Sequence, residues 1–208
     1  MTLVKICGIT SVEDAVEAVR LGVNMLGFVF AESPRRVNIS TVKSIERMVG
    51  ANVRTVGVFT EETDEVLRAM DECSLAYAQL HGGQSEEFAH RIGADRVIRA
   101  ARVRRAEDIA ALSQHPCAAF YLLDAYSEKR MGGTGEPFDW SLAAAPRSLG
   151  RPVILAGGLN PGNVAEAIRA AAPDAVDVSS GVESSPGKKD INKMREFIDN
   201  VRTADSGS

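Results

Sequence analysis

The sequence predicts an α/β fold in which eight parallel strands close into a single (β/α)8 barrel, a TIM barrel. Eight short apolar runs alternate with amphipathic stretches along the whole of the 208 residues. Each strand–helix repeat then has about 26 residues, which accommodates a strand of ~5–6 residues, a helix of ~11 and two short connections. Strict alternation of this kind implies parallel strands joined by right-handed crossovers.

The apolar runs are the predicted strands, because they are continuous segments of strand length rich in β-branched residues. They cover residues 4–9, 25–30, 53–59, 77–81, 96–101, 119–125, 152–157 and 175–180. A doubly wound open sheet is the competing fold. It would have a glycine-rich turn after the first strand, and residues 7–10 (CGIT) do not match G-x-G-x-x-G. The closed barrel is therefore the favoured architecture.

Capping residues mark several of the predicted helices. Ser11 precedes the first helix as an N-cap, with Asp14 three residues later. Asn160-Pro161 opens the helix after the seventh strand with a cap residue and a proline at the first helical position. The last helix is predicted for residues 190–202, where apolar residues recur along one stripe.

The composition is that of an ordinary soluble globular protein. Hydrophobic residues make up 45% and charged residues 25% of the chain, and the net charge is −4. This negative charge argues against nucleic acid or an anionic membrane surface as a partner. No apolar run approaches the ~20 residues of a membrane span, and the first residues do not form a signal peptide. We expect one domain over residues 1–202, followed by a disordered tail over residues 203–208.

The cysteines and histidines indicate neither disulfides nor a metal site. Cys7, Cys73 and Cys117 are odd in number and share no metal-type spacing, and His90 and His115 also lie outside such a spacing. Reduced thiols in a cytoplasmic protein are the expectation. We expect a monomer or a homodimer without a metal ion or cofactor.

The carboxyl ends of the strands are where a barrel of this type carries its active site. Side chains alternate along a strand, so Lys5 and Cys7 share the lumen side of the first strand, with Cys7 at its end. Asp124 ends the otherwise apolar sixth strand on the same side. A thiolate and a carboxylic acid on opposite walls form a base and an acid, as needed to move protons between neighbouring carbons. We predict that Cys7 and Asp124 are catalytic.

Further polar residues converge on the same rim and are predicted to bind substrate. Gln79 and His81 share a side of the fourth strand, and Asp177 and Ser179 share a side of the eighth. Asp177 is expected to pair with a lysine inside the barrel. Arg36, in the loop after the second strand, has the planar guanidinium that binds a carboxylate through two parallel hydrogen bonds.

Glycine-rich loops follow the last two strands and predict a phosphorylated ligand. Gly157 and Gly158 follow the seventh strand, and Ser179-Ser180-Gly181 follows the eighth. In (β/α)8 barrels these two loops form the usual phosphate site, where glycine lets the backbone N–H groups approach the anion. A third loop, residues 131–135 with Gly133 at its centre, is predicted to be a lid or another wall of this site.

A set of motifs, in order and touching all eight repeats, resembles one known family. The motifs are VKICGIT (4–10), GFVF (27–30), SPRRV (33–37), VGVF (56–59), QLHG (79–82), LLD (122–124), GGTG (132–135), FDW (138–140), LAGGLNP (155–161) and DVSSGVE (177–183). Together they are similar to phosphoribosylanthranilate isomerase, the small barrel of tryptophan biosynthesis.

The resemblance implies an Amadori rearrangement of N-(5′-phosphoribosyl)anthranilate without a cofactor. By similarity, Asp124 is the general acid that protonates the furanose ring oxygen, and Cys7 is the general base that removes the proton from C2′. Arg36 is implied to lie near the anthranilate carboxylate, and the loops after strands seven and eight near the phosphate.

Other functions stay open at this point. The related isomerase of histidine biosynthesis would be expected to have a carboxylate in place of Cys7 and a second phosphate loop near mid-chain. An enzyme that serves both pathways would be expected to need a roomier site. In a barrel that binds phosphosugars without catalysis, Cys7 and Asp124 would be packing residues.

Overall fold

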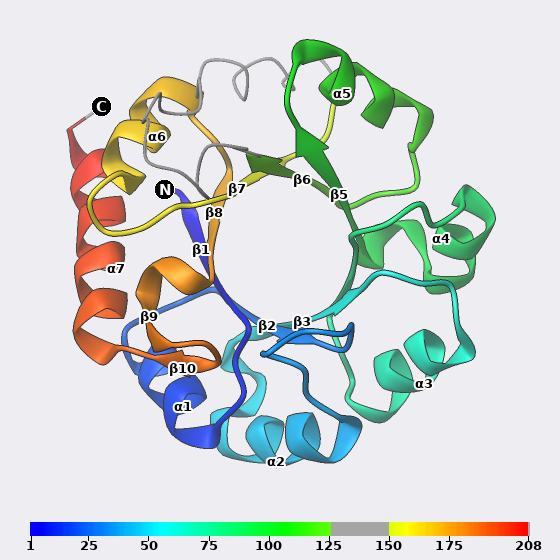
Figure 1. The fold of residues 1–208 in the computed structure, drawn as a ribbon, viewed down its shortest axis with the longest axis horizontal. Helices are drawn as coiled ribbons and strands as arrows, with labels where there is room; N and C mark the ends of the chain where they lie inside the picture. Colours follow the sequence, from blue (N-terminus) through cyan, green and yellow to red (C-terminus); the bar gives the residue numbers. More distant parts are fainter. Residues whose placement is uncertain (126–149, 208) are drawn as a thin grey trace.

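The computed structural model describes residues 1–125 and 150–207, and it confirms the closed barrel (Figure 1). The eight parallel strands follow one another around the ring in sequence order, and the last pairs with the first to close it. They are β1 (Leu3–Cys7), β2 (Met25–Val29), β3 (Arg54–Phe59), β4 (Tyr77–Leu80), β5 (Val97–Val103), β6 (Phe120–Ala125), β7 (Val153–Ala156) and β8 (Ala175–Val178).

Helices surround the barrel on its outer side (Figure 1). The α-helices of the described residues are α1 (Val12–Arg20), α2 (Ile39–Val49), α3 (Asp64–Glu72), α4 (Glu86–Ile92), α5 (Ala106–Ala110), α6 (Val164–Ala171) and α7 (Ile191–Ser206). Among them, none is both long and apolar enough to cross a membrane. The stretch between β6 and β7 that includes Gly133 lies outside the described residues.

Local signals determine where the elements begin and end. The first strand stops at Cys7, before the predicted position 9, because Gly8 has a φ of +74° and leaves the extended conformation. Ser11 caps α1 as predicted and accepts the N–H of Asp14 at 3.1 Å. The predicted helix start at Asn160-Pro161 is wrong, since α6 begins three residues later. The Asn160 side chain instead accepts the N–H of Gly162 at 2.8 Å and forms a turn.

Two apolar layers hold the barrel together. The outer layer lies between the sheet and the helices and contains most of the buried side chains. The inner layer fills the lumen with Met25, Val56, Ile98, Leu122, Ile154, Ala156 and Ala175, which alternate with the outward-facing residues of their strands. The lumen below the mouth is therefore a packed core.

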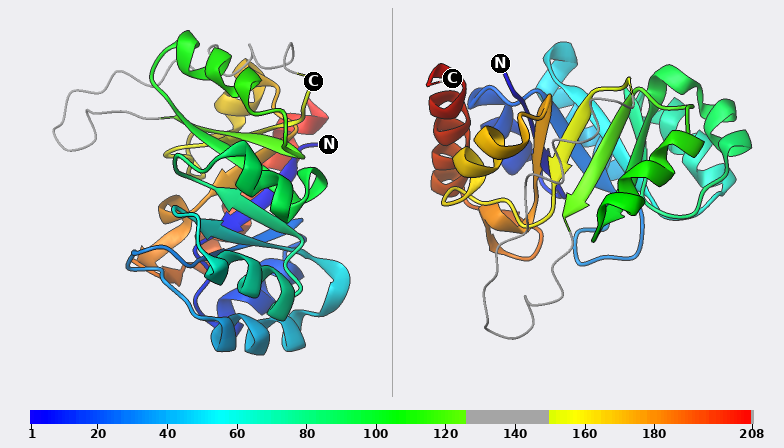
Figure 2. Two further views of the ribbon diagram at one scale, coloured as in Figure 1. Left: turned by 90° about the vertical axis from the view of Figure 1, so that its right-hand side faces the viewer. Right: turned by 90° about the horizontal axis from the view of Figure 1, so that it is seen from above.

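The tail predicted for residues 203–208 is wrong for the part that the structure describes, because α7 continues to Ser206. The Asp205 carboxylate accepts both the backbone N–H and the hydroxyl of Thr2 at 2.7 Å, and Ala204 is buried. Thr2, just before β1, thus anchors the last helical turn. The two chain ends lie close together in both views of Figure 2.

Candidate active site

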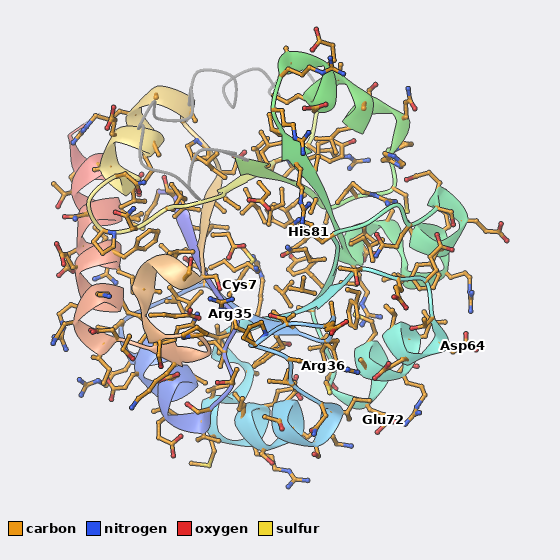
Figure 3. The ribbon with its side chains drawn as sticks, in the orientation of Figure 1. Cys7, Arg35, Arg36, Asp64, Glu72 and His81 are labelled. Atoms are coloured by element: carbon orange, nitrogen blue, oxygen red, sulfur yellow. The ribbon has the colours of Figure 1, made fainter. Side chains whose placement is uncertain are left out.

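A cavity of about 260 Å³ opens at the carboxyl ends of the strands. In the right-hand view of Figure 2, the strand arrows point towards this end of the barrel and away from the chain termini. The cavity is lined by nine of the predicted site residues, namely Cys7, Gln79, His81, Asp124, Gly157, Gly158, Asp177, Ser179 and Ser180, together with apolar residues that include Val58 and Leu122. Alternation along β1, β4, β6 and β8 thus brings side chains from four strands to one place, and the loops after β7 and β8 add the glycines and serines. Cys7 and His81 both lie towards the barrel interior in Figure 3, whereas Asp64 and Glu72 lie on the outer helix α3.

Cys7 sits at the end of β1, beside a buried lysine. The Lys5 ammonium lies 3.0 Å from Asp177, so the predicted lysine–aspartate pair is present in the lumen. Burial raises the pKa of the Cys7 thiol, although the adjacent Lys5 ammonium acts in the opposite direction and favours the thiolate. Burial alone would lower the pKa of Lys5, but Asp177 and Cys7 raise it by more, so Lys5 is charged. The thiol therefore has a fixed cationic neighbour that stabilises its deprotonated form.

Gly27 of β2 provides the room for this thiol. It lies directly across the sheet from Cys7 in the strand register. A Cβ atom at Gly27 would lie 2.8 Å from Cys7 Sγ, 3.0 Å from Cys7 Cα and 3.1 Å from Lys5 Nζ. Only a residue without a side chain leaves space for both groups.

Asp124 lies across the cavity at the end of β6, within a chain of polar groups. His81 Nε2 is 3.4 Å from Asp124 Oδ2, and His81 Nδ1 is 3.4 Å from Gln79 Nε2. When the Gln79 amide donates to Nδ1, the ring proton resides on Nε2 and points at the carboxylate. About a third of the Asp124 side chain is exposed (31%), so the carboxyl group is accessible from the mouth. His81 is thus positioned to orient Asp124.

The two glycine loops adjoin the cavity as predicted. Gly157 and Gly158 both have left-handed backbone angles, with φ of +88° and +72°, which residues other than glycine rarely adopt. Gly181 lies in the short helix after β8, outside the cavity lining. A Cβ atom there would collide with the Leu159 carbonyl oxygen, so this glycine lets the two loops pack against each other. The backbone at this rim is therefore shaped by glycine at three positions.

Arg36 lies apart from the residues that line the Cys7 cavity. It is exposed and borders a neighbouring depression of about 230 Å³ at the ends of β2 and β3, with Phe30 and Phe59 in its lining. Its neighbour Arg35 has a different environment, because its guanidinium forms two hydrogen bonds with Glu183, at 2.8 and 2.6 Å. Figure 3 shows the two arginines and Cys7 in the same sector of the molecule.

Sequence analysis missed a buried ionic network beside Cys7, at the rim of the cavity. Lys189, in the β10 strand (Lys188–Lys189), donates to the Cys7 carbonyl at 2.6 Å and to Glu183 at 2.8 Å. Burial would raise the pKa of Glu183, but Arg35 and Lys189 lower it by more, so the carboxylate is ionised. Glu183 was present in the DVSSGVE motif, but no local signal connects it with Lys189 or Arg35. The network fixes the backbone at Cys7 to the loops that follow β2 and β8.

Together, the fold and the site define a (β/α)8-barrel enzyme with a thiol and a carboxyl group facing one cavity at its mouth. Residues 4–200 match the family model described as N-(5'phosphoribosyl)anthranilate (PRA) isomerase. The chain belongs to this family.

Relatives and solved structures agree with this assignment. The N-(5'-phosphoribosyl)anthranilate isomerase of Citrifermentans bemidjiense is 51% identical over 200 residues, which cover 95% of this chain and 96% of the relative. The crystal structure of phosphoribosyl anthranilate isomerase from Thermotoga maritima has a TM-score of 0.89 at 40% identity and covers 98% of this chain and 100% of that one. Another structure of such an isomerase, at 38% identity and a TM-score of 0.86, covers 98% of this chain and 100% of that one and contains reduced 1-(o-carboxyphenylamino)-1-deoxyribulose 5-phosphate.

Proposed function

We propose that this chain catalyses the Amadori rearrangement of N-(5′-phosphoribosyl)anthranilate to 1-(o-carboxyphenylamino)-1-deoxyribulose 5-phosphate, a step of tryptophan biosynthesis, without a cofactor. One observation carries the proposal: Cys7 and Asp124, from different strands, line a single cavity beside two glycine loops. The reduced product bound in a related isomerase supports the choice of substrate.

Asp124 acts first, as the general acid. It donates a proton to the furanose ring oxygen as the bond between this oxygen and C1′ breaks, which leaves a protonated Schiff base. The Cys7 thiolate then removes the proton from C2′, and the electron pair of this C–H bond neutralises the iminium nitrogen. The resulting enolamine tautomerises to the ketone. One proton is given and one is taken, so the reaction is an isomerisation.

The surroundings of Cys7 suit a strong base whose ionised form, the thiolate, is present in only a small fraction of the molecules. Because burial raises the thiol pKa, the thiolate is the minor form near neutral pH. A base of higher pKa removes a carbon-bound proton more readily once it is ionised. Lys5 supplies the compensating charge at the moment when the thiolate forms, and Asp177 keeps this ammonium in place at 3.0 Å.

The remaining rim residues bind and orient the substrate in this proposal. The backbone of Gly157, Gly158 and residues 179–181 holds the phosphate, and Gln79 and His81 form the wall beside Asp124. Arg36 binds the anthranilate carboxylate from the adjacent depression at the ends of β2 and β3. Asp177 holds the floor of the site through Lys5.

The decisive experiment follows the fluorescence of freshly prepared N-(5′-phosphoribosyl)anthranilate as the purified chain consumes it. We expect Cys7→Ala and Asp124→Asn to abolish turnover while circular dichroism stays unchanged. Cys73→Ala is the matched control. Cys73 is also a buried thiol, but it lies outside the cavity lining and contacts the Ile39 carbonyl. A folded chain without turnover would refute the proposal in favour of a binding barrel. Full activity of either site variant would refute its catalytic assignment.

Two expectations, on cellular location and on oligomeric state, accompany this function. We propose that the chain works in the cytoplasm, where its three cysteines, all free and buried, stay reduced. A monomer or homodimer remains the expectation, and the isomerase of Thermotoga maritima is described as dimeric.

A further inference from the structure

Three side chains of the types that bind metal ions lie close together on the outside of the barrel, away from the cavity at its mouth. Glu86 and His90 of α4 and Cys117, in the segment before β6, each place one ligand atom within 4.8 Å of the others. Glu86 and His90 are four residues apart and therefore share one face of the helix. None of these residues lines the cavity at the barrel mouth, and the proposed reaction does not use them.

The distances suit a tetrahedral ion. Cys117 Sγ lies 3.7 Å from His90 Nδ1. In a tetrahedral zinc site with Zn–S of ~2.3 Å and Zn–N of ~2.0–2.1 Å, sulfur and nitrogen are about 3.5 Å apart. Cys117 is buried whereas His90 is exposed, so the sulfur is shielded and the imidazole leaves a path from solvent.

Outer groups already orient the carboxylate. Glu86 Oε1 accepts hydrogen bonds from His115 Nδ1 and Arg99 Nη2, both at 2.9 Å. Glu86 Oε2 accepts the backbone N–H of Cys117 at 3.1 Å and is the oxygen that faces the thiol segment. Metal-binding carboxylates are held by partners of this kind, and such partners tune the affinity of the site.

We propose that Glu86, His90 and Cys117 form a zinc-binding site, with water as the fourth ligand. Thiolate, imidazole and carboxylate together are ligand types of Zn²⁺, whereas Mg²⁺ and Ca²⁺ require oxygen ligands. On binding, the thiol releases its proton to solvent and the sulfur bonds to the metal, with no change in oxidation state. The ion would tie α4 to the start of β6, the strand that ends at Asp124. This inference does not depend on the proposed reaction.

Sequence analysis found no metal spacing here because the ligands come from two separated segments. His90 and Cys117 are 27 positions apart, and β5 lies between them. The helical pair Glu86–His90 is the only local part of the pattern. The fold supplies the remainder by packing α4 against the segment that leads into β6.

The test uses the full chain, freed of metal with a chelator and titrated with Co²⁺ or Zn²⁺ alone. We expect one equivalent of Co²⁺ to produce a thiolate-to-cobalt charge-transfer band, and Zn²⁺ to abolish it by competition. His90→Gln, at an exposed position, and Cys117→Ala should eliminate the band. His115→Ala should weaken binding by roughly 10–100-fold, as expected for an outer partner.

Control variants distinguish binding at this cluster from binding at other thiols or carboxylates. Glu87→Gln, on the same helix but outside the cluster, and Cys73→Ala, another buried thiol, should bind Co²⁺ like the unaltered chain. A band that persists in His90→Gln, or that disappears in Cys7→Ser, would show that the metal binds elsewhere and would overturn the inference. The absence of any thiolate band in the unaltered chain would overturn it equally.

Discussion

Replacing Gly27 with alanine perturbs the proposed base without removing it. The new methyl group would lie 2.8 Å from Cys7 Sγ, whereas ordinary contacts begin at 3.4 Å, so the sulfur must move by about 0.6 Å. Rotation of the thiol does not relieve the second contact, 3.0 Å from Cys7 Cα, because this atom belongs to the backbone of β1. The strand itself must shift.

We expect kcat/KM to fall by about 10–100-fold, since a displacement near 1 Å in a reacting group costs on the order of 10²-fold. Overpacking should also lower the free energy of unfolding by about 1–3 kcal/mol. The fluorescence assay measures the first effect, and urea denaturation measures the second. Gly83→Ala is the control, because a Cβ atom there meets no atom within 4 Å. Gly27→Ala with undiminished activity would refute the geometry assigned to Cys7 and Lys5.

Three further predictions follow from the site. Because the folded protein raises the pKa of the Cys7 thiol, the thiolate absorbance of the unaltered chain, with that of Cys7→Ser subtracted, should appear only above the ordinary cysteine pKa; a thiolate signal from Cys7 at neutral pH would contradict this. Arg36→Ala should raise KM with little change in kcat if the guanidinium binds the carboxylate equally in the ground and transition states, and a fall in kcat alone would assign it to the transition state. Lys189→Met should destabilise the fold by about 3–5 kcal/mol in urea denaturation, because it leaves the Glu183 carboxylate buried with one cationic partner fewer; a loss under 1 kcal/mol would show that Arg35 alone compensates this charge.

Alternation along single strands explains why much of the site was predictable. Cys7 and Asp124 line the cavity, and Lys5 reaches the cavity residue Asp177, because apolar neighbours on the same strands face the helices. The pairing of Lys5 with Asp177 follows from the same alternation once the first and last strands close the ring. These predictions needed only the period of a strand and the order of the strands.

Contacts between distant segments were not predictable in this way. Arg35 and Glu183 are 148 positions apart, and neither residue carries a local sign of its partner. The same holds for the chain end, where small polar residues suggested disorder but Asp205 is anchored by Thr2. The start of α6 was misplaced because the Asn160 side chain caps a turn, through the N–H of Gly162, and not a helix.

The bond from Lys189 to the Cys7 carbonyl has a consequence for synthesis of the protein. Its two residues are 182 positions apart, so at ~5–20 residues per second a ribosome needs roughly 10–40 s to make the second after the first. Throughout that interval the nascent chain lacks the lysine that braces its amino-terminal strand. Maturation of the barrel mouth must therefore await nearly complete translation, and nascent fragments that stop before β8 should be devoid of turnover.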